Sequence, residues 1–203
     1  MRGLLNIDKG YFPAPNLYGF PELEPCRELV PDFIEWFSFP DRNLISSFAG
    51  SGVHFYCHDF TFESLWTTPK KYVDFLRSVR FVVMPDFSMY YNFPVALQIY
   101  NKYRNHWLAR YLGHYGANVI PNVSVSDLSC FEWSFLGYPV GSVVAFSDIG
   151  SSRSVYDKVV IQRAYEEMLV RLRPRQVLYF TSSVSRVPAG AVPVIVGGRY
   201  GKR

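Results

Sequence analysis

Two polar residues of types that take part in bond cleavage lie at the ends of apolar runs of strand type. Asp86 follows residues 80–84 and is flanked by Phe87, and Asn122 lies near the end of residues 117–123. A carboxylate fixed at the end of a strand, among aromatic rings, can act as a general base or stabilise positive charge in a transition state. Asp86 is therefore the first candidate for a catalytic group. A structural carboxylate in a turn is the alternative.

Small polar residues follow the other strand-like runs as well. They are, in chain order, His58, Asp59, Ser88, Ser124, Ser126, Asp127, Ser147, Asp148, Thr181, Ser182 and Ser183. The carboxyl ends of parallel strands meet at one edge of a sheet, and ligands bind at that edge. We therefore expect these side chains to line one rim. For some positions helix capping is the alternative: Asn92, Asp148, Ser151, Ser152 and Ser154.

The sequence predicts the sheet that this rim requires. Runs of strand type span residues 52–57, 80–84, 117–123, 142–146 and 176–180, and helical patterns span 68–78, 92–113 and 154–172. Strands that alternate with helices indicate right-handed crossovers and a mostly parallel sheet. The runs FVVM, VVAF and VLYF show little alternation, which favours strands covered on both faces. The predicted fold class is α/β, with three layers and a mostly parallel central sheet.

A single domain is the default for a chain of 203 residues. Residues 1–50 are rich in proline and aromatic residues, which predicts an irregular segment that wraps around the domain. We expect the α/β core at residues 51–190. Residues 191–203 are expected to form a basic C-terminal tail.

Composition argues against several classes of protein. No apolar run reaches the length of about 18 residues that a membrane span requires, and residues 1–10 lack a signal-peptide core, so we expect a cytoplasmic protein without a membrane partner. Cys26, Cys57 and Cys130 form no CxxC pair, which argues against a disulfide framework or a structural zinc site. The sequence has no nucleotide-binding glycine loop and no metallopeptidase or kinase motif. We expect no metal and no cofactor.

Basic and aromatic residues are compatible with nucleic-acid binding. The net charge is +4, and aromatic residues make up 18% of the chain. Along the helical pattern that begins at residue 92 and ends near Gly113 or Gly116, the residues Lys102, His106, Arg110 and His114 recur at spacings of four. A solvated helix face is the ordinary interpretation, and a ridge that contacts phosphates is the sharper one. His54 and His58 share a strand face, but a metal site would need a third ligand.

Four short segments resemble an uncharacterised domain family found in phages, mobile elements and bacterial genomes. They are YGFPEL at 18–23, PDFSMY at 85–90, VIPNVS at 119–124 and GYP at 137–139. The resemblance extends over residues 18–183, which is most of the chain. Membership of such a family implies no particular activity.

A second resemblance, to uracil-DNA glycosylases, implies an activity and a uracil-DNA-glycosylase-like fold. Those enzymes carry an aspartate in a turn after the first core strand and a base-reading asparagine at the end of the next strand. Residues 83–87 and 120–122 occupy comparable places here. The resemblance implies that Asp86 orients water or stabilises an oxocarbenium ion and that Asn122 reads the base. The glycosylase His-Pro-Ser motif has no histidine counterpart in residues 181–186, which leaves room for a base other than uracil.

The same resemblance implies further contacts with a flipped nucleotide in DNA. The base would be bound by Phe87, Ser88, Tyr90, Asp148 and Ser183, and phosphates would be contacted by Lys102, Arg110 and Arg186. The chain is also loosely similar to a phage-defence glycosylase that removes glucosylated hydroxymethylcytosine from viral DNA. The leading hypothesis is therefore a monomeric, metal-independent DNA glycosylase that acts on a modified cytosine. The alternatives are a non-catalytic nucleic-acid-binding protein of a mobile element and a hydrolase or transferase of small nucleosides or sugars.

Overall fold

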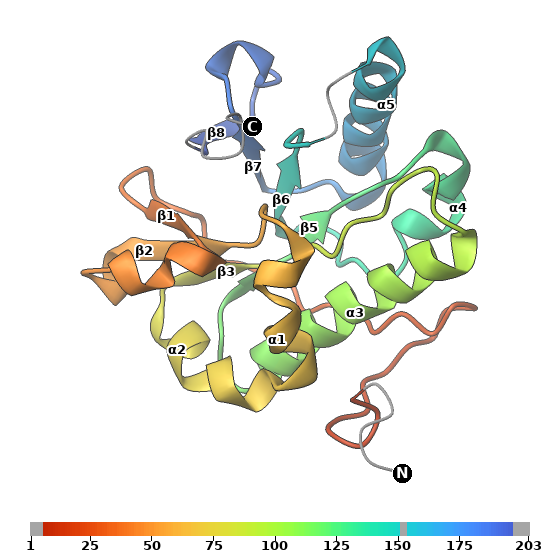
Figure 1. Ribbon diagram of the computed structural model, residues 1–203. Coiled ribbons are helices and arrows are strands. Elements are labelled where there is room, and N and C mark those ends of the chain that lie inside the picture. The colour runs from red at the N-terminus through yellow and green to blue at the C-terminus, as the bar shows by residue number, and fades with distance from the viewer. Residues whose placement is uncertain (1–5, 151–153, 197–203) are drawn as a thin grey trace.

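A computed structural model describes residues 6–150 and 154–196 of the chain. Strands alternate with helices along most of its length (Figure 1). The elements are, in chain order, β1 (Glu35–Ser38), η1 (Phe39–Leu44), η2 (Phe48–Gly50), β2 (Ser51–His54), η3 (Asp59–Thr61), α1 (Glu63–Thr67), η4 (Pro69–Tyr72), α2 (Val73–Ser78), β3 (Phe81–Val83), α3 (Val95–His114), β4 (Val119–Ile120), β5 (Asn122–Val123), η5 (Leu128–Cys130), α4 (Phe131–Ser134), β6 (Val143–Ser147), α5 (Val155–Leu172), β7 (Gln176–Thr181), η6 (Val184–Arg186) and β8 (Val192–Ile195), where η marks a 3₁₀ helix.

The strands form two parallel sheets of four strands each, in the orders β1-β2-β3-β4 and β5-β6-β7-β8. Pro121 alone separates β4 from β5. On one side of this segment, the Met84 N–H donates to the carbonyl oxygen of Ile120, and on the other side the Ala145 N–H donates to the carbonyl oxygen of Pro121. The two sheets therefore continue into each other, and their strands follow chain order throughout.

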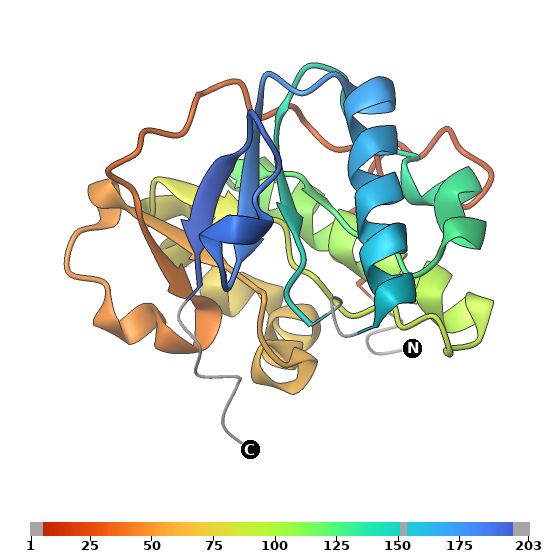
Figure 2. The same cartoon turned by 90° about the horizontal axis from the view of Figure 1, so that it is seen from above.

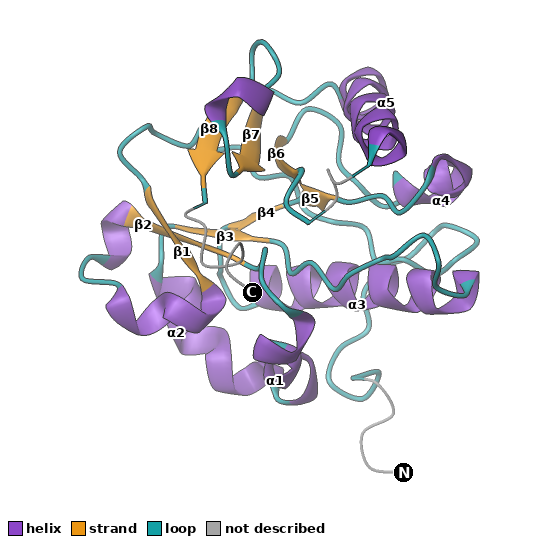
Figure 3. Ribbon diagram, turned by 45° about the horizontal axis from the view of Figure 1, so that its top comes forward, coloured by secondary structure: helices purple, strands orange, loops and turns teal. Residues whose placement is uncertain are grey.

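Strands in chain order, joined by right-handed crossovers, place their helices on one face of a sheet. On that face, Val53 and Val82 pack against α1, α2 and α3, and Phe146 packs against α5. Figure 3 shows α1, α2 and α3 along β1–β4, and α4 and α5 beside β5–β7. The expected α/β class with parallel strands is present.

The opposite face of the sheet is concave, and it is filled by side chains from the strands and from the segments next to them. Its core includes Phe81, Val83, Ile120 and Leu178, with no residue of a described α-helix. The rings of Trp36 in β1 and Phe180 in β7 meet across it, 5.2 Å apart. The prediction of helices on both faces is therefore wrong for the residues that the structure describes. Apolar runs such as FVVM arise because the curled sheet packs one side against the helices and the other side against itself.

Two expected segment boundaries differ in the structure. The wrapping segment at 1–50 contributes β1, and the tail expected from residue 191 begins with β8, which pairs with β7. Both strands add apolar side chains to the concave core. Short strands with proline neighbours give weak patterns, so the sequence did not reveal these two. Residues 197–203 of the expected tail lie outside the described residues.

The last part of the wrapping segment before β1 runs along the edge where the strands begin (Figure 2). A backbone bridge joins Cys26 to Val143, and the Val30 N–H donates to Oε1 of Gln176 at 2.8 Å. These contacts tie the wrapping segment to the start of β6 and β7. The opposite edge, where the strands end, is formed by loops.

Most predicted helices and their signals are present. Ser154 caps α5 in a reciprocal pair with Asp157, as its residue type suggests. The residue before α3 is Pro94, so the expected cap at Asn92 is wrong. No helix in the described ranges 6–150 and 154–196 is long and apolar enough to cross a membrane.

Candidate functional site

The turn after β3 is clamped by side chains from α3 and η3. The Phe87 N–H donates to Oδ1 of Asn105 at 2.8 Å, and Nδ2 of Asn105 donates to the Phe87 carbonyl oxygen at 3.2 Å. The backbone N–H and the hydroxyl of Ser88 donate to the carboxylate of Asp59 at 3.1 and 2.9 Å. Nδ2 of Asn101 donates to the Ser88 carbonyl oxygen at 2.6 Å. The backbone that carries Asp86 is thus fixed from two elements.

Asp86 and Asn122 lie against each other. Nδ2 of Asn122 donates to Oδ1 of Asp86 at 2.9 Å, and the Tyr56 hydroxyl donates to Oδ1 of Asn122 at 2.7 Å. The Tyr138 hydroxyl donates to the Asn122 carbonyl oxygen at 2.5 Å. Asn122 is buried, whereas Asp86 keeps part of its surface exposed. The structure brings together the two residues that the sequence singled out, and three hydrogen bonds orient Asn122 toward Asp86.

The environment of Asp86 raises the pKa of its carboxyl to about 7. Burial is the main cause, and the negative charge of Asp59 adds to it. The side chains of Ser124 and Asn122 and the positive charge of Lys102 act in the opposite direction. The carboxyl therefore changes its protonation state close to neutral pH, as a group that transfers protons requires.

Lys102 stands behind this site and is fully buried. Its ammonium donates to the carbonyl oxygen of Ser134 at 2.6 Å and to the hydroxyl of Tyr138 at 2.9 Å, and it lies 4.1 Å from the centre of the Tyr138 ring. Burial holds the pKa of Lys102 well below its usual value. The predicted contact between Lys102 and a phosphate is wrong for this conformation, because the ammonium has no exposed surface. Its role is to hold Tyr138, which in turn holds Asn122.

The basic stripe predicted on α3 is not a solvent-facing ridge. His106 is fully buried, with Nδ1 at 2.8 Å from the Pro21 carbonyl oxygen, and burial lowers its pKa well below the usual value. The Arg110 side chain is 17% exposed and pairs with Glu24. The Arg110 guanidinium is therefore not free to contact a phosphate in the predicted way.

Two of the predicted base-binding residues at the turn lack a free face. Phe87 is fully buried, with its ring 4.7 Å from that of Phe62 and 3.6 Å from the guanidinium carbon of Arg104. It cannot stack on a base in this conformation, so that prediction is wrong. Ser88 is engaged by Asp59. Tyr90, by contrast, is 54% exposed.

The remaining predicted residues form a separate group at the ends of β6 and β7. Asp148 is buried and pairs with Arg186, with 3.6 Å between Oδ2 and Nη1. Oδ1 of Asp148 has no hydrogen-bond partner among the described residues. The Ser183 hydroxyl lies 2.9 Å from that of Ser185. Among the interactions between residues 6–150 and 154–196, no hydrogen bond joins Asp148 or Ser183 to Asp86.

Asp59 lies at the site, as expected for a residue of the predicted rim, but the sequence did not single out three other residues that build the site: Tyr56, Asn105 and Tyr138. The signal for Tyr56 was that it shares a strand face with His54, and Tyr138 stands in the GYP segment. His54 lies beside it, buried against the rings of Tyr56 and Phe180, and burial lowers its pKa to about 4. The described residues contain no group of histidine, cysteine and carboxylate side chains that could hold a metal ion.

A small hollow of about 90 Å³ lies elsewhere, between α3 and the wrapping segment. Its lining includes Leu23, Glu24, Ala109, Arg110 and Pro121, and neither Asp86 nor Asn122 contributes to it. The polar network around Asp86 is therefore the stronger candidate site.

Comparison with known proteins places the chain among phage-related sequences. It is 30% identical over 169 residues to the "Gene 1 protein" of Mycobacterium phage L5, across 83% of this chain and 73% of that protein. It is 28% identical over 169 residues to the "Gene 1 protein" of Mycobacterium phage D29, of which it spans 62%, less than two thirds. No solved structure matches. A family model described as "Domain of unknown function (DUF4417)" matches residues 12–194, and the chain therefore belongs to that family.

Proposed function

We propose that this chain is a DNA glycosylase that hydrolyses the N-glycosidic bond of a modified base, with Asp86 as its catalytic carboxylate. The main support for this proposal is the environment of the Asp86 carboxyl. A partly exposed carboxyl with a pKa of about 7 is held 2.9 Å from a buried asparagine, at the edge where the parallel strands end. This is the edge of such sheets at which ligands bind.

The chemistry suits a fixed carboxylate. Departure of the base leaves positive charge on the sugar, and an ionised Asp86 nearby stabilises that charge. The carboxylate also accepts a proton from the attacking water, whose oxygen bonds to C1′ while the base leaves with the bonding electrons. Asn122 uses Nδ2 for Asp86 and Oδ1 for Tyr56, so we assign it the role of a positioning residue.

The substrate class rests on resemblance. The placement of a carboxylate after a core strand resembles uracil-DNA glycosylases, and the named relatives come from phages. We therefore propose phage DNA with modified cytosine, such as the glucosylated hydroxymethyl form, as the substrate of a monomeric, cytoplasmic enzyme.

A second candidate is a hydrolase of small nucleosides. It is favoured because the side chains predicted to contact phosphates are not free to do so. Lys102 is buried, and Arg110 and Arg186 pair with carboxylates. A mononucleoside needs no row of phosphate contacts, whereas duplex DNA binds mainly through its phosphates.

The test is the formation of abasic sites. Purified protein is incubated with phage DNA that carries normal, hydroxymethylated or glucosylated cytosines, and aldehyde groups are then labelled with a hydroxylamine probe. We expect abasic sites in one modified DNA and a rate at least about 100-fold lower in Asp86→Asn. Asp74→Asn, an exposed carboxylate on α2, is the matched control and should keep full activity.

Four outcomes would decide against the proposal. Absence of abasic sites in every DNA, or full activity of Asp86→Asn, overturns it. Thermal stabilisation by nucleosides and not by DNA supports the second candidate. Salt-dependent DNA binding that persists in Asp86→Asn without any product indicates a non-catalytic binding protein.

A further inference from the structure

Four exposed aromatic side chains are carried by the segments around the turn of Asp86. Phe60, Tyr90, Tyr91 and Tyr156 expose 78%, 54%, 66% and 49% of their surface. They come from η3, from the loop between β3 and α3, and from the first turn of α5. We call these four side chains the aromatic rim. Large exposed rings that gather near one site mark a binding surface.

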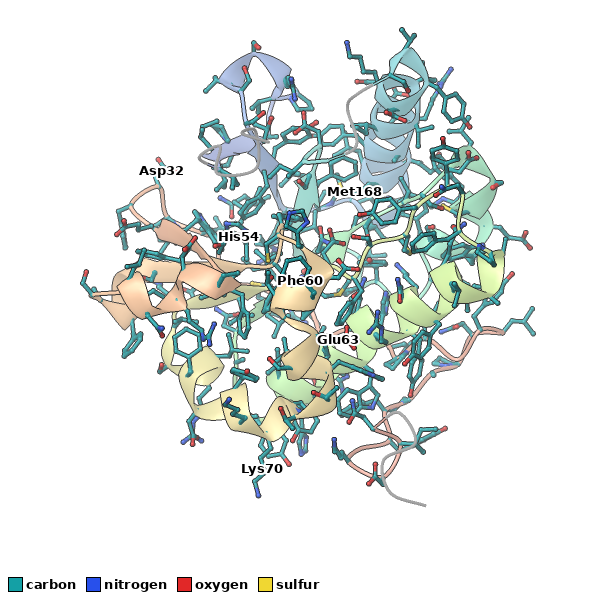
Figure 4. The ribbon with its side chains drawn as sticks, viewed as in Figure 1. Asp32, His54, Phe60, Glu63, Lys70 and Met168 are labelled. Atoms are coloured by element: carbon teal, nitrogen blue, oxygen red, sulfur yellow. The ribbon has the colours of Figure 1, made fainter. Side chains whose placement is uncertain are left out.

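The Phe60 end of the aromatic rim is tied directly to the candidate site. Phe60 follows Asp59, whose carboxylate accepts both hydrogen bonds from Ser88, two residues beyond Asp86. The Phe60 ring stacks on His58, with 5.4 Å between centres and 11° between planes. Figure 4 shows Phe60 on the turn between His54 and Glu63. The ring is therefore supported on one face and is largely open to solvent.

Hydrogen bonds also join the other segments of the aromatic rim. The side-chain amide of Gln98 makes two of them. Its Nε2 donates to the Phe93 carbonyl oxygen at 2.9 Å, and its Oε1 accepts from the Ser126 hydroxyl at 2.5 Å. The Tyr156 hydroxyl donates to Oδ2 of Asp127 at 2.8 Å. Gln98 and Tyr156 thus connect the loop after β3, the loop after β5 and the start of α5.

We propose that the aromatic rim binds the unpaired bases of single-stranded nucleic acid and leads one of them to Asp86. This inference rests on the proposed function and names its substrate form. An exposed ring stacks on any base whose face is free, and the bases of a duplex are already stacked on their neighbours. The three side chains predicted to contact phosphates are buried or paired, so base stacking is the interaction that the aromatic rim offers.

Fluorescence anisotropy with a short labelled oligonucleotide tests the inference, in the Asp86→Asn background so that nothing is cleaved. We expect the single strand to bind more tightly than the matched duplex. Phe60→Ala and Tyr91→Ala should each weaken binding of the single strand by about 5- to 100-fold, as expected for the loss of one stacked base. Phe60→Trp should retain binding, because it keeps a ring in place.

The matched control is Phe33→Ala. Phe33 is also an exposed aromatic residue, at 67%, but it lies just before β1, at the edge where the strands begin. Its removal should leave the affinity unchanged. Unfolding curves of each variant confirm that the loss of an exposed ring has not disturbed the fold.

Equal affinity for single strand and duplex, unchanged affinity in both alanine variants of the aromatic rim, or binding of nucleosides alone overturns the inference. Abasic-site formation by the unsubstituted chain is measured separately, so the two proposals can fail independently. Rim-dependent binding without any abasic product supports the aromatic rim and overturns the glycosylase proposal. Abasic product formed at an unchanged rate by the alanine variants of the aromatic rim supports the glycosylase proposal and overturns the role of the aromatic rim.

Discussion

The carboxyl of Asp86 is surrounded by groups that act on its charge in opposite directions. Burial and Asp59 favour its protonated form, whereas Asn122 and Lys102 favour the anion. The pKa of about 7 is the result of that opposition. Carboxyls whose charged form is destabilised by burial cluster at functional sites, which supports the proposed role of Asp86.

Asp86→Asn is expected to stabilise the fold at pH 8 and to have less effect near pH 4. The folded-state pKa of Asp86 is raised from 3.8 to about 7, so the folded chain keeps a proton that the unfolded chain releases. The stability that this proton contributes is present below the unfolded pKa and is lost as the pH rises through about 7. Asparagine keeps the shape without the charge. Urea unfolding at both pH values measures the difference.

Asp74→Asn serves as the control, because Asp74 is exposed on α2. Its substitution should change the free energy of unfolding little at either pH. A stability difference between Asp86→Asn and the unsubstituted chain that is equal at pH 4 and pH 8 would show that the carboxyl of Asp86 titrates normally.

At the scale of elements, α3 is the part that positions the site. Its polar residues Asn101, Lys102 and Asn105 are buried against the turn after β3 and the segment after α4, while Trp107 and Tyr111 join the apolar core. A buried polar face gives no clear separation of apolar and polar stripes. The helix itself could be predicted from sequence, but spacing alone did not show that Lys102 faces inward.

Asn105→Ala should destabilise the protein by about 2–4 kcal/mol, because it leaves a buried N–H and a buried carbonyl oxygen of Phe87 without their partner. The same change should lower activity, since Asp86 precedes Phe87 on the released backbone. Chemical denaturation measures the first effect and the abasic-site assay the second.

Gln162→Ala on the exposed part of α5 is the comparison, and it should change the stability by less than about 0.5 kcal/mol. A fully stable and active Asn105→Ala variant would show that the turn does not depend on the clamp.

In the molecule as a whole, the curl of the sheet determines where the candidate site around Asp86 lies. The strands follow chain order, all described α-helices lie outside the concave face, and Asp86, Asn122 and Tyr56 lie at the end of that face. The class and the parallel strands could be predicted from the alternation of elements. The curl could not, because a run such as residues 81–84 is equally apolar under a second helix layer and inside a concave core.

Gly52→Ala tests the closure of that concave face. A Cβ atom at position 52 would come within 2.4 Å of the Trp36 ring, which packs on Phe180 across the sheet. We expect a loss of about 1–3 kcal/mol of stability from overpacking, measured by denaturation.

Gly113→Ala is the matched control, since a Cβ atom there meets nothing within 4 Å at the end of α3. That substitution should be neutral or stabilise the fold by up to about 1 kcal/mol. Equal effects of the two substitutions would contradict the contact between β1 and β7 through Trp36.

The pH dependence of abasic-site formation shows whether an ionised Asp86 drives cleavage of a glycosidic bond. With modified phage DNA and the unsubstituted chain, we expect a rate that rises about tenfold per pH unit below pH 7 and levels off above it. Asp86→Asn should stay at background at every pH. A rate in Asp86→Asn that equals that of the unsubstituted chain would show that the carboxyl of Asp86 takes no part in the cleavage.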